Sequence, residues 1–135
     1  MSMDFFTVSA CLADPGGDNF QLFLFKAPAS ANGGGVRLVS AYASAPTSQA
    51  AATSFSLALH KYSSAGTPAV NGTIAPAIGG TAATYWTAGV PQAFVISTSY
   101  NFLDAGEWLV VDYQEDGTVT PTGGAYITCV FQPGN

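Results

Sequence analysis

The chain has 135 residues, of which 48% are hydrophobic and only 8% are charged, and its formal net charge is −5. This length favours one domain over residues 1–135, and the low charge suits a surface that packs against other proteins. The three basic residues, Lys26, Arg37 and Lys61, are scattered, so the chain lacks the clustered Lys and Arg that bind nucleic acids or anionic membranes.

Short apolar or alternating segments separated by turn residues recur along the chain, as is typical of an all-β domain. In the first half, strands are expected over 5–12, 20–26, 36–42 and 53–62. Clusters rich in Gly and Asn, at 14–19 and 32–35, mark turns between them. Residues 44–52 are expected to form a loop with at most one turn of helix, because Pro46 limits a longer one.

The second half has a weaker pattern. Residues 65–89 are rich in Gly and small residues and contain two prolines, so we expect a long loop with one short strand near 83–86. Further strands are expected over 92–98, 107–113 and 125–132, with tight turns at 103–106 and 115–118. Seven or eight strands at this spacing predict a β-sandwich of the jelly-roll kind.

Two strands predict how side chains divide between the faces of a sheet. In 53–62, the apolar Phe55, Leu57 and Leu59 alternate with polar or small residues, which indicates one buried face and one solvated face. In 20–26 both faces are partly apolar, so this strand is expected to be covered on two sides, one of them by a neighbouring subunit. Its expected faces are Phe20, Leu22 and Leu24 on one side and Gln21, Phe23 and Phe25 on the other.

Cys11 and Cys129 are the only cysteines. We expect two buried free thiols, because free Cys packs as a small apolar residue. A disulfide joining the terminal strands is the alternative, but it needs an oxidising compartment. Residues 1–6 carry an early acid and no positive charge, so no secretory signal is expected there.

The sequence contains no motif that would give its candidate catalytic residues a nucleophile, a base or a metal ion to act with. His60, the only histidine, lies at an outward strand position without a nucleophile elbow or a cysteine signature to act with. Neither a zinc nor a calcium spacing is present. Late acidic residues are expected to be solvated side chains of turns and strand ends: Asp104, Glu107, Asp112, Glu115 and Asp116. The chain is therefore predicted not to be an enzyme and to hold no metal or cofactor.

Aromatic residues offer another kind of site. Trp108 lies inside an apolar strand and is expected in the core. Tyr85 and Trp86 lie beside Gly89 in a loop-rich region and are the better candidates for an exposed contact, such as stacking on a sugar. Packing in the core or against a subunit is the favoured interpretation of this pair, and the sugar contact is the alternative.

Three stretches carry a resemblance to a known family. They are Ser56–Tyr62 followed by Gly66-Thr67, the Leu103–Val111 turn and strand, and the apolar Ala125–Phe131 ending in Gln132-Pro133. In these stretches the chain resembles the small β-sandwich decoration (cement) proteins that tailed bacteriophages place on their capsids. The likeness spans residues 26–133 and leaves 1–25 outside, and Glu107 stands where such proteins usually have Asp. Other jelly rolls, such as tumour-necrosis-factor-like trimers, share the turn.

The resemblance implies a structural virion protein that binds the outer face of the major capsid protein shell. It implies a homotrimer that assembles in the host cytoplasm and stays on the capsid surface. The residues that we expect at contacts with sister subunits or the capsid are Phe5, Phe6, Phe23, Phe25, Tyr85 and Trp86. A carbohydrate- or receptor-binding module of a phage fibre or spike is the alternative function, and a small hydrolase is a third.

Overall fold

The computed structural model describes residues 5–12, 19–29, 34–49, 54–81, 84–115 and 124–134. These residues contain no helix, and hence none that is long and apolar enough to cross a membrane. The strands are β1 (Phe6–Leu12), β2 (Asn19–Lys26), β3 (Val36–Ser44), β4 (Phe55–Tyr62), β5 (Pro68–Ile78), β6 (Gln92–Ala93), β7 (Phe102–Leu103), β8 (Trp108–Glu115) and β9 (Ala125–Pro133).

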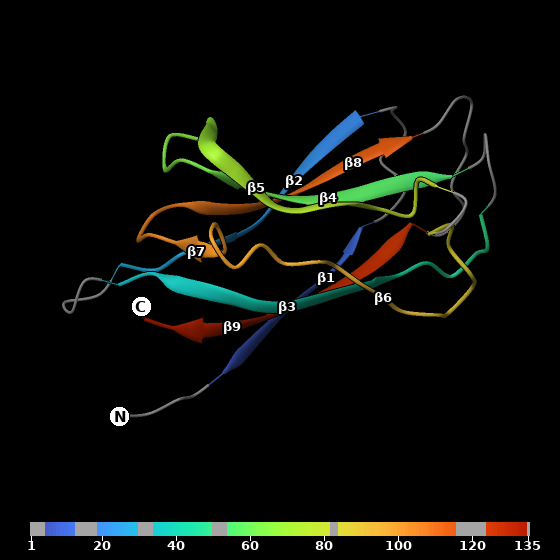
Figure 1. The fold of residues 1–135 in the computed structure, drawn as a ribbon, viewed down its shortest axis with the longest axis horizontal. Coiled ribbons are helices and arrows are strands. Elements are labelled where there is room, and N and C mark those ends of the chain that lie inside the picture. The colour runs from blue at the N-terminus through green and yellow to red at the C-terminus, as the bar shows by residue number, and fades with distance from the viewer. Residues whose placement is uncertain are drawn as a thin grey trace.

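The strands form two antiparallel sheets that face one another. Sheet A has the order β1-β9-β3-β6, with β7 also paired to β3, and sheet B has the order β2-β8-β4-β5. Figure 1 shows sheet B as the upper layer and sheet A as the lower layer. The chain changes sheet at most connections, and β9 and β8 each insert between strands made much earlier. This order is that of a jelly roll, so the predicted all-β, jelly-roll-like sandwich is confirmed.

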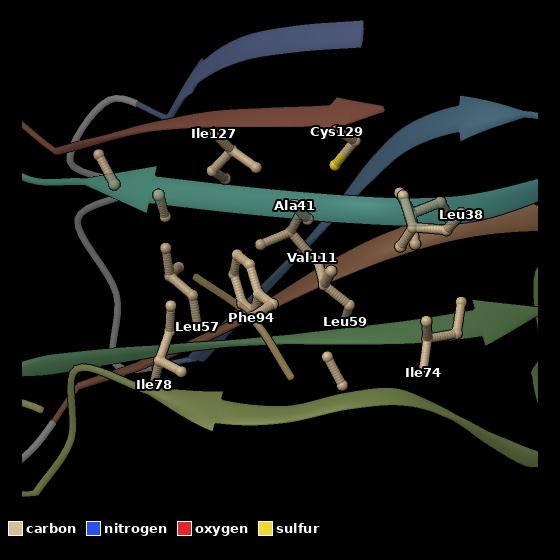
Figure 2. Packing of buried hydrophobic residues seen from close by; sticks show 14 of the residues in the cluster. Leu38, Ala41, Leu57, Leu59, Ile74, Ile78, Phe94, Val111, Ile127 and Cys129 are labelled. Atoms are coloured by element: carbon tan, nitrogen blue, oxygen red, sulfur yellow. The ribbon is translucent and has the colours of Figure 1, made fainter. Parts of the chain in front are cut away.

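The core lies between the sheets and takes one side chain in two from each strand. Figure 2 shows Leu57 and Ile78 of sheet B facing Ile127 of sheet A, with Phe94 between the layers. The predicted buried face of β4 is confirmed, because Phe55, Leu57 and Leu59 are all buried, but Ser54 and Ala58 of the expected solvated face are buried as well. Burying a side chain of this size stabilises the fold by about 1.5–3 kcal/mol.

One end of the core is closed by stacked rings. The ring of Phe55 lies 5.3 Å from that of Trp86 and 5.2 Å from that of Tyr113. The indole of Trp86 donates to the carbonyl of Phe55 over 2.9 Å, so its polar atom is satisfied inside the core. Gly79 has a φ of +88°, and a Cβ at this position would overlap the Trp86 indole.

The expected long loop over 65–89 is wrong, because β5 occupies eleven of its residues. This strand lies at the edge of sheet B, where a proline removes no hydrogen bond that the ladder needs. Its pairing with β4 shifts register three times, and Asn71 has a positive φ of 53°. The prolines, the glycine and the bulges thus interrupt the pattern by which a strand is predicted from sequence.

The other weak predictions have mixed outcomes. Residues 84–86 form no strand, and the expected strand over 92–98 is reduced to the two residues of β6. β6 and β7 both pair with β3, each along a different part of it, and so together take the place of one strand in sheet A. No helical turn occurs over 44–49, and most of the predicted turn at 115–118 lies outside the described residues.

A β-bulge in β2 changes which face its aromatic residues occupy. Phe23 pairs with Val110, but Phe25 pairs with Leu109, so one residue, Leu24, is extra on the β2 side. The shift turns Phe25 towards the core, where its ring lies 4.6 Å from that of Phe131. The expectation that Phe23 and Phe25 share a face is therefore wrong.

The two cysteines lie on neighbouring strands but on opposite faces of sheet A. Cys129 is buried, and Figure 2 shows its sulfur pointing between the sheets, whereas Cys11 is exposed. Both thiols are free, so the expected free state is confirmed and the expected burial of Cys11 is wrong. Burial raises the pKa of the Cys129 thiol to about 12, from an ordinary value of 9.0.

Thiol chemistry should separate the two residues. In the folded protein a water-soluble disulfide reagent should label Cys11 alone, and unfolding should expose Cys129.

The raised pKa of Cys129 also predicts how stability depends on pH. The stability that the neutral thiol contributes is fully present below pH 9.0 and is lost between 9.0 and about 12, at about 1.4 kcal/mol per pH unit. Between pH 8 and pH 10.5, the urea midpoint of wild type should therefore fall further than that of Cys129→Ala. Parallel pH dependence of the two proteins would contradict the assignment.

Two glycines test the packing of Trp86. Gly79→Ala and Gly89→Ala place a Cβ at similar positive φ values, but only Gly79 faces another residue within 4 Å. The Gly89 variant should cost about 1 kcal/mol of backbone strain, and the Gly79 variant at least about 2 kcal/mol more because the indole must move. Chemical denaturation measures both. Equal losses would show that Trp86 does not pack against Gly79.

Candidate functional site

The outward side of sheet A is the first candidate surface. Its side chains come from alternate positions of β1, β9 and β3, since the inward positions fill the core. In the register, Ser9 and Tyr42 both lie opposite Thr128, and Ser44 and Cys11 both lie opposite Tyr126. We call this outward side the sheet A face; its residues are Thr7, Ser9, Cys11, Ser40, Tyr42, Ser44, Ala93, Tyr126, Thr128 and Val130.

Two tyrosines dominate the sheet A face. Tyr42 is 46% exposed and Tyr126 is 52% exposed. Together with Pro91 and Thr128 they line a shallow groove of about 420 Å³. Beside it the hydroxyls of Ser9 and Thr128 hydrogen-bond to each other over 3.2 Å. The surface therefore offers large rings beside a pair of hydroxyls that already bond to each other.

Charge is absent from the centre of the sheet A face. Among the described residues of sheet A, the one charged side chain is Arg37, at the end of the sheet beside β7. Its guanidinium donates to Asn101 Oδ1 over 3.2 Å and lies 5.6 Å from the centre of the Phe102 ring. The sheet A face thus carries neither acids nor a free cation.

The late acidic residues lie elsewhere. Asp112 and Glu115 belong to β8 in sheet B, while Asp104 and Glu107 belong to the turn before it. Glu115 accepts a hydrogen bond from the buried Tyr113 hydroxyl over 2.8 Å, and Glu107 accepts one from the Asp104 amide over 2.8 Å. These two carboxylates hold local structure, and Asp116 lies outside the described residues.

The predicted interface phenylalanines fall into two groups. Phe5 is 56% exposed and precedes β1, and Phe23 is 40% exposed on the outward side of sheet B. Phe6 instead stacks on Phe131 at 5.3 Å and lies 5.7 Å from Phe25, so both of these rings pack against the core. Phe6 and Phe25 are thus half-buried against the core, and their expected part in surface contacts stays a prediction.

Within the Tyr85-Trp86 pair, Trp86 also packs inward. Trp86 is 1% exposed, which rules out its expected role at a surface contact and agrees with the core interpretation. Tyr85 is half-buried, and its backbone carbonyl accepts a hydrogen bond from Gln92 Nε2 over 3.2 Å. A sugar could therefore not stack on Trp86 without opening the core.

Trp108 is the reverse case, because it was expected in the core and lies on the outward side of sheet B. There Phe23 meets Tyr62 and Trp108 edge to face, with ring centres 5.2 and 5.5 Å apart. Lys26 lies 5.3 Å from the centre of the Trp108 ring. The three rings form an outward aromatic cluster beside Val110, which has no exposed surface.

The described residues contain no group of three His, Cys, Asp or Glu side chains placed to hold a metal ion. Comparisons of the chain with protein-family models, curated proteins and solved structures found no match. The candidate surfaces are therefore defined by their geometry alone.

Adjacent phenylalanines separate the exposed contacts from the core. Phe6→Ser should lower the free energy of unfolding by about 3–5 kcal/mol, because it removes a ring packed on Phe25 and Phe131. Phe5→Ser should change it by less than about 0.5 kcal/mol, since the ring is exposed. Urea denaturation of both variants measures the difference. A destabilisation by Phe5→Ser as large as that by Phe6→Ser would contradict these placements.

Proposed function

We propose that this chain is a structural virion protein that decorates and stabilises the capsid of a tailed bacteriophage. It binds the outer surface of the major capsid protein shell as a homo-oligomer, with the trimer implied by the resemblance. The observation that carries the proposal is the sheet A face, a surface with two exposed tyrosines and no charged residue at its centre. Exposed aromatic rings of this kind are the residues that contribute most to protein interfaces.

Electrostatics favours a sister subunit as the partner of the sheet A face. The chain has a net charge of −5, so two copies repel one another unless they meet where acids are absent. Every carboxylate of the described residues lies in sheet B or in the turn before β8. Contact through sheet A keeps these acids apart and buries Tyr42 and Tyr126 together.

The capsid contact would then use other parts of the surface. In an oligomer closed through sheet A, the outward side of sheet B and the exposed Phe23 on it remain available. Of the predicted contact residues, Phe23 keeps a role in the capsid contact of the proposal. The low content of charged residues, 8%, suits a protein with several neighbours on a particle.

A double variant tests the oligomer. The double variant Tyr42→Ser, Tyr126→Ser should be monomeric where wild type is oligomeric, because each buried tyrosine contributes on the order of 2 kcal/mol to such a contact. Val70→Ser, which changes a residue that is 89% exposed on β5, is the control and should leave the oligomer intact. Sedimentation velocity gives the mass of each protein. A wild type that stays monomeric at about 100 µM would remove the oligomer from the proposal.

A second measurement tests the capsid role. Mass spectrometry of purified virions should find the chain in a fixed ratio to the major capsid protein, and washing should not remove it. Capsids stripped of the chain should rupture at a lower temperature and regain stability when purified wild-type protein is added. Virions that lack the chain would overturn the proposal.

A further inference from the structure

The outward side of sheet B carries a polar groove that the capsid role does not explain. The groove measures about 460 Å³ and crosses all four strands, from Gln21 of β2 to Thr73 of β5. A neighbouring hollow of about 330 Å³ shares His60, Thr73, Asp112 and Gln114 with it and extends along β4 to Ser56. The two hollows together form one depression that runs from β2 to β5 and along β4 to Ser56.

A fixed carboxylate lies at the centre of the groove. Gln21 Nε2 donates to Asp112 Oδ1 over 3.0 Å, and Gln114 Nε2 donates to Asp112 Oδ2 over 3.1 Å. His60 Nε2 lies 3.8 Å from the second oxygen. Each carboxylate oxygen keeps a lone pair for a further donor, and the two glutamine carbonyl oxygens are further acceptors. The site thus presents several hydrogen-bonding groups in an orientation fixed before any ligand arrives.

One end of the groove is aromatic. Tyr62 lines the groove and also belongs to the outward aromatic cluster with Phe23 and Trp108. The Phe23 ring stands at 82° to the Tyr62 ring, so the cluster is held by edge-to-face contacts. Pro76 and Ala77 line the neighbouring hollow beside its polar side chains. Polar and apolar residues therefore both line the depression.

The irregular part of β5 forms the far wall. The pairing of β4 with β5 shifts register between His60 and Tyr62, where β5 contributes Asn71 and Gly72 to the lining. A Cβ on Gly72 would lie 2.7 Å from the carbonyl oxygens of Ala69 and Lys61, so this close approach requires glycine. The irregularity that made β5 hard to predict is thus the feature that forms the far wall of the groove.

We propose that this groove is a binding site for a neutral oligosaccharide. A sugar combines hydroxyls, which both donate and accept, with an apolar face of C–H groups, and the groove combines the matching surfaces. Asp112 would accept from two neighbouring hydroxyls, and the glutamine and histidine side chains would complete the contacts. Tyr62 would support the apolar face of one ring.

Charge excludes other ligand classes. An anionic ligand would meet Asp112 without a free cation, because the Lys61 ammonium donates to the Phe102 carbonyl over 3.1 Å and lies 4.0 Å from Glu107. A nucleic acid needs several such cations. An apolar ligand would cut the Asp112 carboxylate off from water without offering it a further donor, which costs several kcal/mol. A neutral, polyhydroxylated ligand avoids all three penalties.

The inference does not rest on the oligomer contact proposed for the sheet A face. The groove lies on the outward side of sheet B and the two exposed tyrosines lie on that of sheet A, so the two surfaces are separated by the whole sandwich. Loss of the oligomer in the Tyr42 and Tyr126 double variant should leave sugar binding intact. Failure of either proposal can thus be told apart from failure of the other.

The test is a titration of the purified protein with neutral hexasaccharides of glucose, galactose, mannose and N-acetylglucosamine. Isotope-edited NMR should show at least one of them binding with a Kd between about 10 µM and 1 mM. The shifted amides should centre on Gln21, His60, Tyr62, Thr73, Asp112 and Gln114. No binding by any hexasaccharide, or shifts confined to sheet A, would overturn the proposal.

A matched pair of variants tests the role of the carboxylate. Asp112→Asn keeps the shape of the side chain and should weaken binding at least about tenfold, because it replaces charge-assisted hydrogen bonds by neutral ones. Asp104→Asn makes the same chemical change on a residue that does not line the groove, and should bind as wild type does. The unfolding midpoint of each variant checks that both are folded. Equal affinity of the two variants would refute the site.

Discussion

Two sheets bury a single apolar layer between them, and every strand is therefore divided into an inward row and an outward row. The inward rows have little freedom: Leu57 and Leu59 of β4 belong to one buried cluster with Ile127 of β9 and Leu38 of β3. Whatever the protein binds must use the outward rows. These rows differ in kind, because sheet A presents tyrosines and hydroxyls, while sheet B presents a carboxylate, amides and a histidine.

The sequence predicted the fold class because the central strands have strong patterns. β4 alternates cleanly, and β9 and β8 are apolar on the side that faces the core, so their existence and approximate bounds followed from the period of two. β5 was missed because its hydrogen bonds come from one neighbour only, and because Pro68, Gly72 and Pro76 are poor strand residues in isolation. An edge strand is specified by its neighbour more than by its own composition.

The candidate surfaces were harder to predict, because they depend on register and on bulges. Tyr42 and Tyr126 are 84 positions apart in number, and only the pairing of β3 with β9 places them on one face. Phe25 and Trp108 were each assigned to the wrong side, the first because of an extra residue in β2 and the second because its neighbour Leu109, and not Trp108 itself, faces the core. Asp112 and Gln21 are separated by 91 residues and meet only across the β2–β8 ladder.

The position of β9 has a consequence for how the chain reaches this structure. β9 lies between β1 and β3, and β8 lies between β2 and β4, so each sheet is split in two until a late segment arrives. A growing polypeptide cannot complete its core in order, because its first strand has no partner until residues 125–133 have left the ribosome. Until then Phe6 and Val8 of β1 face water, and such non-local pairing makes folding slow and exposes apolar strands to other chains. Removal of the last nine-residue strand would therefore leave both β1 and β3 with open edges and the core uncovered, which is more than the loss of one strand from an end.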